Sequence, residues 1–386
     1  MKNIRLKDIA IVTSGNSAPQ NDKMFEDGIY PFVRTSDVGR VHLSASFTKP
    51  EDYLNETGIK GMKLFPKDSI LFPKSGASTL LNHRVLLGED SYVVSHLAVI
   101  VPDKSKVVPL YLYYYTTRID AGELVNDRAY PSLKTSILEQ VSLNLPSLAE
   151  QERIVTELDL LTGIIDKQKS QLKELDNLAQ SIFYDMFGDP VQNERGWERK
   201  TISELCYPKR NVLRASKVFE ASDIINYIDI SSIDNKNNIM TSMSSMFFSE
   251  APSRAQQVVA NDDILISLVR PNLKNVAIVN QDADNLVASS GFCVLRHLPC
   301  ITNEFLFYIT KSKAFTEYLM QRVSGANYPA VREEDIKDYF TIVPFLEMQI
   351  SFSQKIQAIE SQKAAINRSI AETQKLFDYT MDKYFG

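Results

Sequence analysis

The sequence predicts an α+β protein in which two similar α/β domains follow each other, each leading into a long helix. Residues 147–188 carry apolar side chains at alternating spacings of four and three, and residues 345–386 repeat this pattern 198 positions later. Short motifs in the segments before the helices also recur. A seven-residue apolar repeat is typical of helices that pack against a partner helix. We therefore expect the two helices to pair as an antiparallel coiled coil.

The repeat divides the chain into four segments. The predicted boundaries are a first domain at 1–146, a first long helix at 147–188, a second domain at 189–344 and a second long helix at 345–386. A chain of 386 residues is long enough for two domains with cores of their own. The organisation is therefore a tandem duplication of one domain-and-helix unit.

The first long helix has local start and stop signals. Ser147 and Glu150 have the spacing of a capping box. Gly188 and Pro190 favour termination, because glycine accepts the left-handed conformation and proline cannot continue a helix. The positions predicted to face the partner helix are Ile154, Leu158, Leu161, Ile165, Leu172 and Leu175, with Gln168, Ala179 and Ile182 in the same series.

The second long helix repeats the first with poorer matches. Pro344 and Gln349 correspond to Pro146 and Gln151, whereas Phe345 replaces the capping serine. The predicted pairing positions are Phe352, Ile356, Ile359, Ile366, Ile370 and Phe377, while Lys363 and Thr373 occupy two positions of the apolar series.

The two globular segments predict the same order of short strands and helices. β-Branched and aromatic runs favour strands, and helical spacing of apolar residues favours helices. In the first segment we expect strands at 30–34, 69–72 and 91–101 and a helix at 109–119. In the second we expect strands at 263–269 and 286–295, a helix at 304–322 and a loop at 324–332.

Composition indicates an ordinary reduced globular protein. Hydrophobic residues make up 44% of the chain, the net charge is −5, and the three cysteines form no C-x-x-C pair. No apolar run approaches the length of a membrane span. We expect a cytoplasmic protein without a metal site. The acidic net charge does not exclude nucleic-acid binding, because local patches matter more than the total.

Motifs for catalysis and for cofactor binding are missing from the sequence. No two glycines have G-x-G spacing, and no Gly-Lys pair marks a phosphate-binding loop. The four histidines are scattered, and Asn327-Tyr328-Pro329-Ala330 only superficially resembles a methyl-transfer tetrapeptide. The sequence therefore predicts a protein that is not an enzyme and holds no cofactor.

Basic residues with polar and aromatic neighbours cluster in corresponding loops of the two domains. Arginine and asparagine can contact guanine and adenine edges through two hydrogen bonds, and lysine and tyrosine suit phosphate. The alternative for each residue is an ordinary solvated charge. The candidate DNA contacts are Arg34, Thr35, Lys74, Ser75, Arg84, Arg128 and Tyr130 in the first domain, and Arg210, Arg254, Arg270, Asn272, Lys274, Asn327, Tyr328 and Arg332 in the second.

The order of these motifs resembles a known family. The run Leu145-Pro-Ser-Leu-Ala-Glu-Gln-Glu-Arg-Ile154 at the first helix, with Ile264-Leu-Ile-Ser267 and Asn303-Glu-Phe-Leu-Phe-Tyr308 before the second helix, is similar to the specificity subunit of type I restriction–modification systems. The resemblance covers both repeats. It implies two target-recognition domains for double-stranded DNA and a bipartite, asymmetric site.

The resemblance also implies partners. Two methyltransferase subunits would dock on the long helices and supply cofactor and chemistry, with restriction subunits as further partners and no membrane. Two other functions stay open. The chain could be a self-sufficient DNA methyltransferase or endonuclease, or a coiled-coil adaptor that does not bind DNA.

Overall fold

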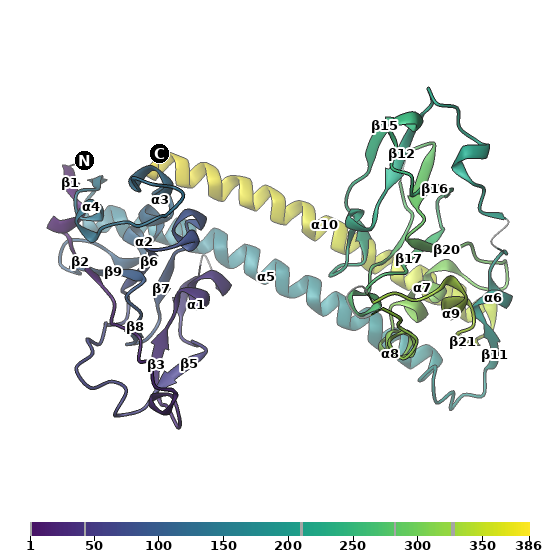
Figure 1. Cartoon of the computed structure of the whole chain (residues 1–386), viewed down its shortest axis with the longest axis horizontal. Helices are drawn as coiled ribbons and strands as arrows, with labels where there is room; N and C mark the ends of the chain where they lie inside the picture. The colour runs from purple at the N-terminus through teal and green to yellow at the C-terminus, as the bar shows by residue number, and fades with distance from the viewer. Residues whose placement is uncertain (1, 42–43, 209–210, 282, 326–328) are drawn as a thin grey trace. The chain divides into compact units, whose positions relative to one another are not determined.

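The computed structural model describes residues 2–41, 44–208, 211–281, 283–325 and 329–386. The chain forms two compact units, one of Met1–Lys169 with Arg368–Gly386 and one of Ser170–Asn367. We call these unit 1 and unit 2 and describe each by itself (Figure 1). Within the described ranges, no helix combines the length and apolar character needed to cross a membrane.

The described residues of unit 1 form three sheets. Its five-stranded sheet has the order β2-β9-β6-β7-β4, its three-stranded sheet the order β5-β3-β8, and β1 pairs with β10. The elements are β1 (Lys2–Arg5), β2 (Ala10–Ser14), β3 (Tyr30–Val33), α1 (Thr35–Arg40), β4 (Ser44–Phe47), β5 (Asp52–Leu54), β6 (Ile70–Pro73), β7 (Val85–Leu87), β8 (Tyr92–Val93), β9 (Leu97–Pro102), α2 (Pro109–Thr117), α3 (Ala121–Leu124), α4 (Thr135–Leu138), β10 (Ser142–Leu145) and the first part of α5 (Leu148–Phe187).

Unit 2 is built on a related plan. It has a four-stranded sheet of order β15-β12-β19-β16, a three-stranded sheet of order β18-β17-β20, and the pairs β11-β21 and β13-β14. The elements are β11 (Glu198–Thr201), α6 (Ile202–Leu205), β12 (Ile224–Ile228), β13 (Ile233–Asp234), β14 (Ile239–Met240), β15 (Ser244–Phe247), β16 (Ala255–Val258), β17 (Ile264–Ser267), β18 (Val276–Ile278), β19 (Leu286–Ser289), β20 (Phe292–Leu295), α7 (Asn303–Thr310), α8 (Lys313–Met320), α9 (Glu333–Lys337), β21 (Phe340–Val343) and the first part of α10 (Leu346–Phe385).

Strand pairing in the two units follows the repeat of the sequence. β6 lies between β7 and β9 in antiparallel pairing, as β17 lies between β18 and β20. The parallel pair β3-β8 corresponds to the parallel pair β12-β19. Both β6 and β17 are fully buried, and both begin with a run of apolar residues, Ile70-Leu-Phe72 and Ile264-Leu-Ile266. The mixed α and β architecture with a long C-terminal helix is therefore as the sequence predicts.

Three predicted elements are each divided in two by a local turn. The strand expected at 91–101 is β8 and β9, and the one expected at 286–295 is β19 and β20. The helix expected at 304–322 is α7 and α8, because the Ser312 hydroxyl accepts a hydrogen bond from Phe315 N at 3.1 Å and starts a second helix. The prediction of one continuous element was wrong in all three cases, although the residue ranges were close.

The termini of α5 follow the signals in the sequence. Glu150 N donates to the Ser147 hydroxyl at 3.3 Å. Gly188 has a φ of +75°, and its N–H bonds to Tyr184 O at 2.8 Å. A left-handed glycine that closes a helix in this way is a common C-terminal cap.

One buried glutamine in each unit fixes the start of the long helix to the preceding segment. The Gln151 side chain accepts from Val108 N at 2.8 Å and donates to Pro146 O at 3.0 Å. Gln349 repeats this arrangement with Thr302 N at 3.0 Å and Pro344 O at 2.8 Å. Both glutamines are fully buried, so their polar atoms are satisfied by backbone groups rather than by water.

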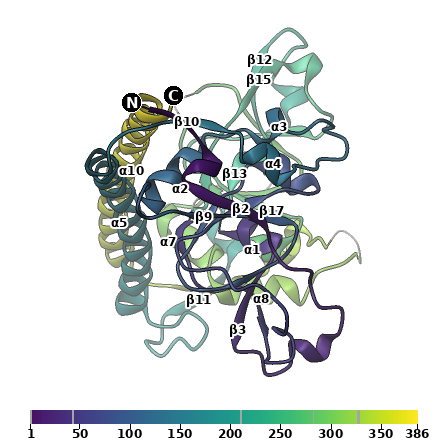
Figure 2. The same cartoon turned by 90° about the vertical axis from the view of Figure 1, so that its left-hand side faces the viewer.

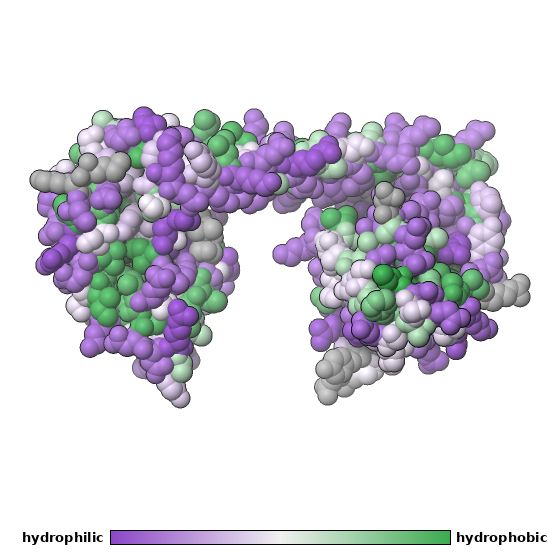
Figure 3. All heavy atoms as spheres, turned by 90° about the horizontal axis from the view of Figure 1, so that it is seen from above, coloured by the Kyte–Doolittle hydropathy of each residue, from purple (hydrophilic) through white to green (hydrophobic). Residues whose placement is uncertain are grey.

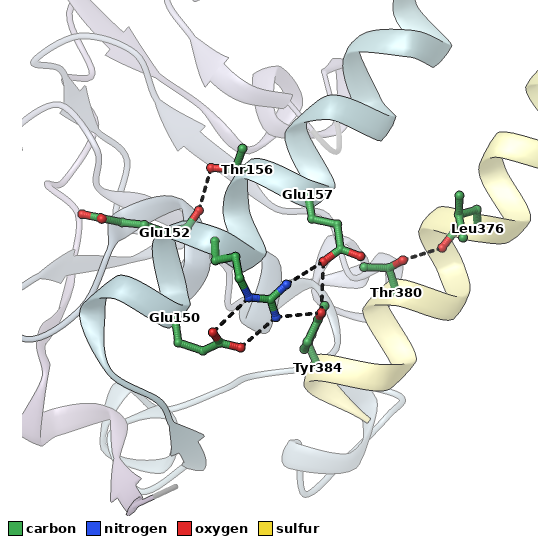
Figure 4. Close-up of polar contacts among 8 residues, drawn as sticks. Glu150, Glu152, Thr156, Glu157, Leu376, Thr380 and Tyr384 are labelled. Carbon is green, nitrogen blue, oxygen red and sulfur yellow. Dashed lines mark hydrogen bonds and ion pairs between the residues drawn. The ribbon is translucent and has the colours of Figure 1, made fainter.

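In unit 1 the start of α5 and the end of α10 run side by side (Figure 2). Arg153 donates to Glu150 at 2.7 Å, to Glu157 at 3.2 Å and to the Tyr384 hydroxyl at 2.9 Å, and Figure 4 shows the three acceptors converging. Phe377 packs against Tyr114 with ring centroids 6.1 Å apart. The predicted pairing positions in this unit are buried or half-buried: Ile154, Leu158, Leu161, Ile165, Ile370 and Phe377.

In unit 2 the end of α5 contacts the start of α10. Phe183 and Phe187 lie 5.7 and 5.3 Å from Phe352 between ring centroids, and both also pack on Phe305 of α7. The predicted pairing positions here are also buried or half-buried: Leu172, Leu175, Phe352, Ile356, Ile359 and Ile366. In each unit, the long helices therefore pack against the globular domain and complete its hydrophobic core.

Candidate nucleic-acid interface

Two loops of unit 1 that carry candidate DNA contacts lie next to each other. Gly76 N donates to Pro131 O at 2.9 Å, and Leu133 N donates to Lys74 O at 2.8 Å. Gly76 has a φ of +75°, a conformation that favours glycine. The Ser75 hydroxyl lies 3.1 Å from His96 Nδ1. These bonds bring the segment after β6 against the loop that precedes α4.

Arg128 and Tyr130 stand beside this loop pair. They line a hollow of about 330 Å³ together with Gly76 and Leu80. Tyr130 is 83% exposed, and Arg128 Nε donates to Gly122 O at 3.3 Å. An exposed aromatic ring and a guanidinium beside an open hollow are a suitable surface for nucleic acid.

Unit 2 contains the same loop pair. Arg270 N donates to Pro329 O at 2.7 Å, and Val331 N donates to Leu268 O at 2.9 Å. Gly76 and Arg270 lie 194 positions apart, and the two prolines 198 positions apart, which are the offsets of the repeat. The backbone scaffold is therefore the same in both units, while the side chains on it differ.

The loop between β17 and β18 in unit 2 carries three candidates. Arg270 and Lys274 both have left-handed conformations, with φ of +49° and +52°, and flank a short 3₁₀ turn that contains Asn272. Asn238 Nδ2 donates to Lys274 O at 2.7 Å and holds the end of the loop. Arg270 and Asn272 are exposed, and Lys274 is half-buried.

The prediction for Arg84 is wrong. Its side chain is fully buried, and it donates to Thr116 O at 3.2 Å and Ile119 O at 3.0 Å at the end of α2. Its guanidinium carbon lies 3.3 Å from the centroid of the Phe72 ring. Burial lowers the pKa of Arg84 to about 9, against an opposing effect of Asp120. Arg84 therefore caps a helix and cannot reach DNA.

Two further arginines are engaged within their own units. Arg34 forms an ion pair with Asp52 and lies over the rings of Phe25 and Phe32. Arg254 bonds to Asp229 at 2.6 Å and to the Tyr227 hydroxyl at 3.1 Å. The Tyr227 hydrogen bond and the Asp229 charge raise the pKa of Arg254. Both arginines are only partly available for phosphate.

The remaining candidates are placed as follows. Thr35 begins α1, Lys74 and Ser75 are half-buried in the loop pair, and Arg332 is exposed at the start of α9. Arg210, Asn327 and Tyr328 lie outside the described residues. The structure thus brings Lys74, Ser75, Arg128 and Tyr130 together in unit 1, and Arg270, Asn272 and Lys274 on one loop in unit 2.

Unit 2 has further polar side chains near its loop pair. Arg214, Lys217 and Gln256 line a hollow of about 680 Å³ that also includes Leu268 of the loop pair. No motif and no repeated offset marks these three residues in the sequence, so residue pattern alone does not identify them.

Comparison with known proteins finds the same domain twice in this chain, in agreement with the repeat of the sequence. A family model described as the type I restriction modification DNA specificity domain matches residues 1–177 and again residues 194–374. The chain is 21% identical to the type I restriction enzyme MjaIX specificity subunit of Methanocaldococcus jannaschii, over 98% of this chain and 91% of that protein. It is 20% identical to the EcoBI specificity subunit of Escherichia coli, over 99% and 85%.

Two solved structures share the fold. The S subunit of a type I restriction-modification system from M. genitalium has a TM-score of 0.58 and 12% identity, over 100% of this chain and 96% of that one. A chain from a study of complex assembly and conformational transition of the type I R-M system has a TM-score of 0.55 and 18% identity, over 100% and 97%.

Proposed function

Because the chain belongs to the type I restriction modification DNA specificity family, we propose that it is the DNA sequence-recognition subunit of a type I restriction–modification complex. The family resemblance predicted from the sequence is thereby confirmed. In this function, units 1 and 2 each recognise one half of a bipartite, asymmetric site in double-stranded DNA.

One observation carries the proposal of two different half-sites. Both units hold the same hydrogen-bonded loop pair, at Gly76–Pro131 and at Arg270–Pro329. The side chains on it are different: Lys74, Ser75 and Gly76 in unit 1 correspond to Leu268, Val269 and Arg270 in unit 2. A shared scaffold with different hydrogen-bonding groups suits two domains that bind DNA in the same way and recognise different bases.

The proposed subunit has no catalytic role and binds no cofactor. Two methyltransferase subunits supply the methyl-transfer chemistry, and restriction subunits supply cleavage. We expect the methyltransferase subunits to dock on the two long helices, which pair as an antiparallel coiled coil. The contacts of α5 with α10 inside each unit, Arg153 with Tyr384 in unit 1 and Phe183 with Phe352 in unit 2, support this pairing.

A patch on the helices of unit 1 is suited to such docking. Hydrophilic residues cover most of the visible face of the long helices, with isolated hydrophobic residues among them (Figure 3). In unit 1, Leu160 and Ile164 of α5 and Leu376 and Tyr379 of α10 are exposed. Ile164 directly precedes the pairing position Ile165, and Leu376 directly precedes the pairing position Phe377. These two positions correspond in the seven-residue repeat, and in an antiparallel pair they lie on the same side. Exposed apolar residues gathered on one side are typical of a protein interface.

The test is to express the chain with its methyltransferase subunits and to map methylated sites across a genome. We expect one bipartite, non-palindromic motif, and salt-dependent binding of duplexes that contain it. Replacing 189–344 with another family member's domain should change only one half of the motif.

The competing functions give other results. If the purified chain alone binds S-adenosylmethionine or cleaves DNA, it is a self-sufficient enzyme. If neither the chain nor its complex shows salt-dependent DNA binding, the chain is an adaptor.

A further inference from the structure

Two hollows adjoin each other on unit 2. Their volumes are about 680 and 230 Å³, and Arg214 and Gln256 line both. These two side chains therefore stand between the hollows. We call this pair the ridge.

The backbone beneath the ridge is fixed by hydrogen bonds. Gln256 belongs to β16, and the segment that contains Arg214 runs beside this strand. Val258 N donates to Leu213 O at 2.9 Å, and Arg214 forms an antiparallel bridge with Gln257. Gln257 in turn donates to Ser289 O and Phe292 O, both at 2.9 Å. The ridge is thus carried by paired backbone segments, which fix the positions of its two Cα atoms.

The ridge lies next to the loop pair of unit 2. Leu268 lines the larger hollow, and its carbonyl oxygen accepts the Val331 N–H of the loop pair. Glu334, two residues after Arg332 in the first turn of α9, lines the same hollow. A duplex bound at the loop pair would therefore also reach the ridge.

The hydrogen-bonding groups of the ridge are available. Among the described residues, the Arg214 guanidinium forms no hydrogen bond or ion pair, and it is exposed. Gln256 donates one amide N–H to Ser253 O at 2.8 Å, which leaves its carbonyl oxygen and its second N–H for a ligand. A guanidinium fork matches O6 and N7 of guanine, and a carboxamide matches N6 and N7 of adenine.

The charges around the ridge favour base edges over phosphate. Glu333 and Glu334 both line the larger hollow, and Glu333 is paired with Lys337 at 2.6 Å. A surface that followed the phosphate backbone would be basic throughout. A mixture of guanidinium, amide and carboxylate groups is instead typical of the major-groove code. Lys217, at the edge of the same hollow, is the group suited to a phosphate.

We propose that Arg214 and Gln256 determine the specificity of unit 2. The ridge enters the major groove of the half-site, where Arg214 contacts a guanine and Gln256 contacts an adenine, while Lys217 contacts a backbone phosphate. The inference rests on the proposed function, since it names the base-contacting residues of one half of the site.

The test uses the full chain in complex with its methyltransferase subunits. The variants are Arg214→Ala, Arg214→Lys, Gln256→Ala and Lys217→Ala. Lys313→Ala is the control, since Lys313 is a highly exposed lysine of unit 2 that lines neither hollow. Methylated sites are mapped for each complex. Binding of cognate and unrelated duplexes is measured by fluorescence anisotropy over a range of salt concentrations.

We expect Arg214→Ala and Gln256→Ala each to relax one base position in the same half-site. Binding of the cognate duplex should weaken by about 5- to 150-fold, and binding of unrelated duplexes should change little. Arg214→Lys should keep non-specific affinity and lose the base preference, because lysine lacks the planar fork. Lys217→Ala should weaken binding of all duplexes equally and reduce the salt slope by about one.

Two results would overturn the assignment. One is an unchanged motif in both Arg214→Ala and Gln256→Ala while the wild-type complex discriminates sequences. The other is a change in both halves of the motif. If the wild-type complex shows no sequence preference at all, the proposed function itself fails, and the assignment of the ridge fails with it.

Discussion

At the scale of single residues, Lys311 shows how the two repeats have diverged. Its ammonium lies 3.9 Å from the centroid of the Tyr308 ring and 5.0 Å from that of Phe307. Burial, and to a lesser extent the charge of Lys363, lower the pKa of Lys311 to about 8, although Glu360 and Asp176 act in the opposite direction. The corresponding residue of unit 1 is Thr117, whose hydroxyl donates to Tyr114 O at 2.7 Å. Unit 2 therefore carries a cation where unit 1 carries a neutral, satisfied hydroxyl.

We predict that Lys311→Met stabilises unit 2 at neutral pH. Because the folded pKa lies below the ordinary value of 10.5, the unfolded chain binds more protons between about pH 8 and 10.5. Wild-type stability should rise through this window. The variant should be more stable by about 1–3 kcal/mol at pH 7, and this excess should shrink towards zero near pH 10.5.

Urea unfolding can measure this effect, followed by the fluorescence of Trp197, which belongs to unit 2 and is the single tryptophan of the chain. Lys313→Met is the matched control, since Lys313 is highly exposed. Equal stability of Lys311→Met and wild type at pH 7 would contradict the prediction.

At the scale of elements, the long helices are the part that the sequence predicts best. Their apolar series extends over many turns, and local signals such as Ser147 and Gly188 mark the ends of α5. Short elements are different. The breaks in the predicted strands and helix depend on turn bonds such as Leu97 N to Val94 O at 3.0 Å, which apolar periodicity does not encode.

The candidate DNA contacts are also only partly predictable from the sequence, for a different reason. Tyr130 and Asn272 were selected by residue type, and both are exposed on loops, because their local sequence is typical of loops; their contact with DNA stays a prediction. It failed for Arg84, whose acceptors Thr116 and Ile119 lie more than thirty positions away. A buried arginine needs carbonyl oxygens from a distant helix end, and a single sequence does not reveal that the chain brings them there.

A polar position in the apolar series of α10 provides a test of the helix pairing in unit 2. The Lys363 side chain is only 13% exposed and bonds to Asp176 of α5 at 2.8 Å and to Glu360 at 3.0 Å. Burial disfavours its charge, but the Asp176 hydrogen bond and Glu360 raise the pKa of Lys363 overall. We predict a coupling free energy of about 1 kcal/mol between Lys363 and Asp176 in a double-mutant cycle of Lys363→Met and Asp176→Ala.

The exposed pair Lys313–Glu317 of α8, 3.5 Å apart, is the control, and its coupling should stay below about 0.5 kcal/mol. Both cycles are measured by urea unfolding. Equal couplings in the two cycles would mean that the α5–α10 contact at Lys363 adds nothing beyond an ordinary surface ion pair.

At the scale of the whole molecule, the duplication gives the two units a similar backbone scaffold with different side chains on it. Gln151 and Gln349 hold the two helix starts through corresponding backbone partners, so this part of the scaffold is repeated. Lys311 and Arg270 of unit 2 are not repeated, since Thr117 and Gly76 stand at the corresponding positions of unit 1. A chain with one scaffold and two sets of contact residues is suited to recognise two different DNA sequences.

Unit 1 also depends on the end of the chain. Phe385 lies 5.0 Å from Tyr111 between ring centroids, Phe377 packs on Tyr114, and Met381 is buried in the same core.

We predict that deleting 368–386 destabilises unit 1 by several kcal/mol, because large apolar side chains leave its core. Unit 2 should still unfold cooperatively, as measured by the fluorescence of Trp197. Hydrogen exchange, resolved by segment, should show loss of protection in β6 and β9 and retained protection in β17 and β20. Protection lost from unit 2 instead would contradict this division.

The division of unit 1 between two distant segments has a consequence for synthesis on the ribosome. The residues of unit 2 form one continuous segment, and all of them are translated before 368–386. The first domain therefore leaves the ribosome with an incomplete core. The side of this core at Tyr111 and Tyr114 stays uncovered until the second domain has been synthesised. The second domain can finish folding first, and the domain that is translated first is the last to mature.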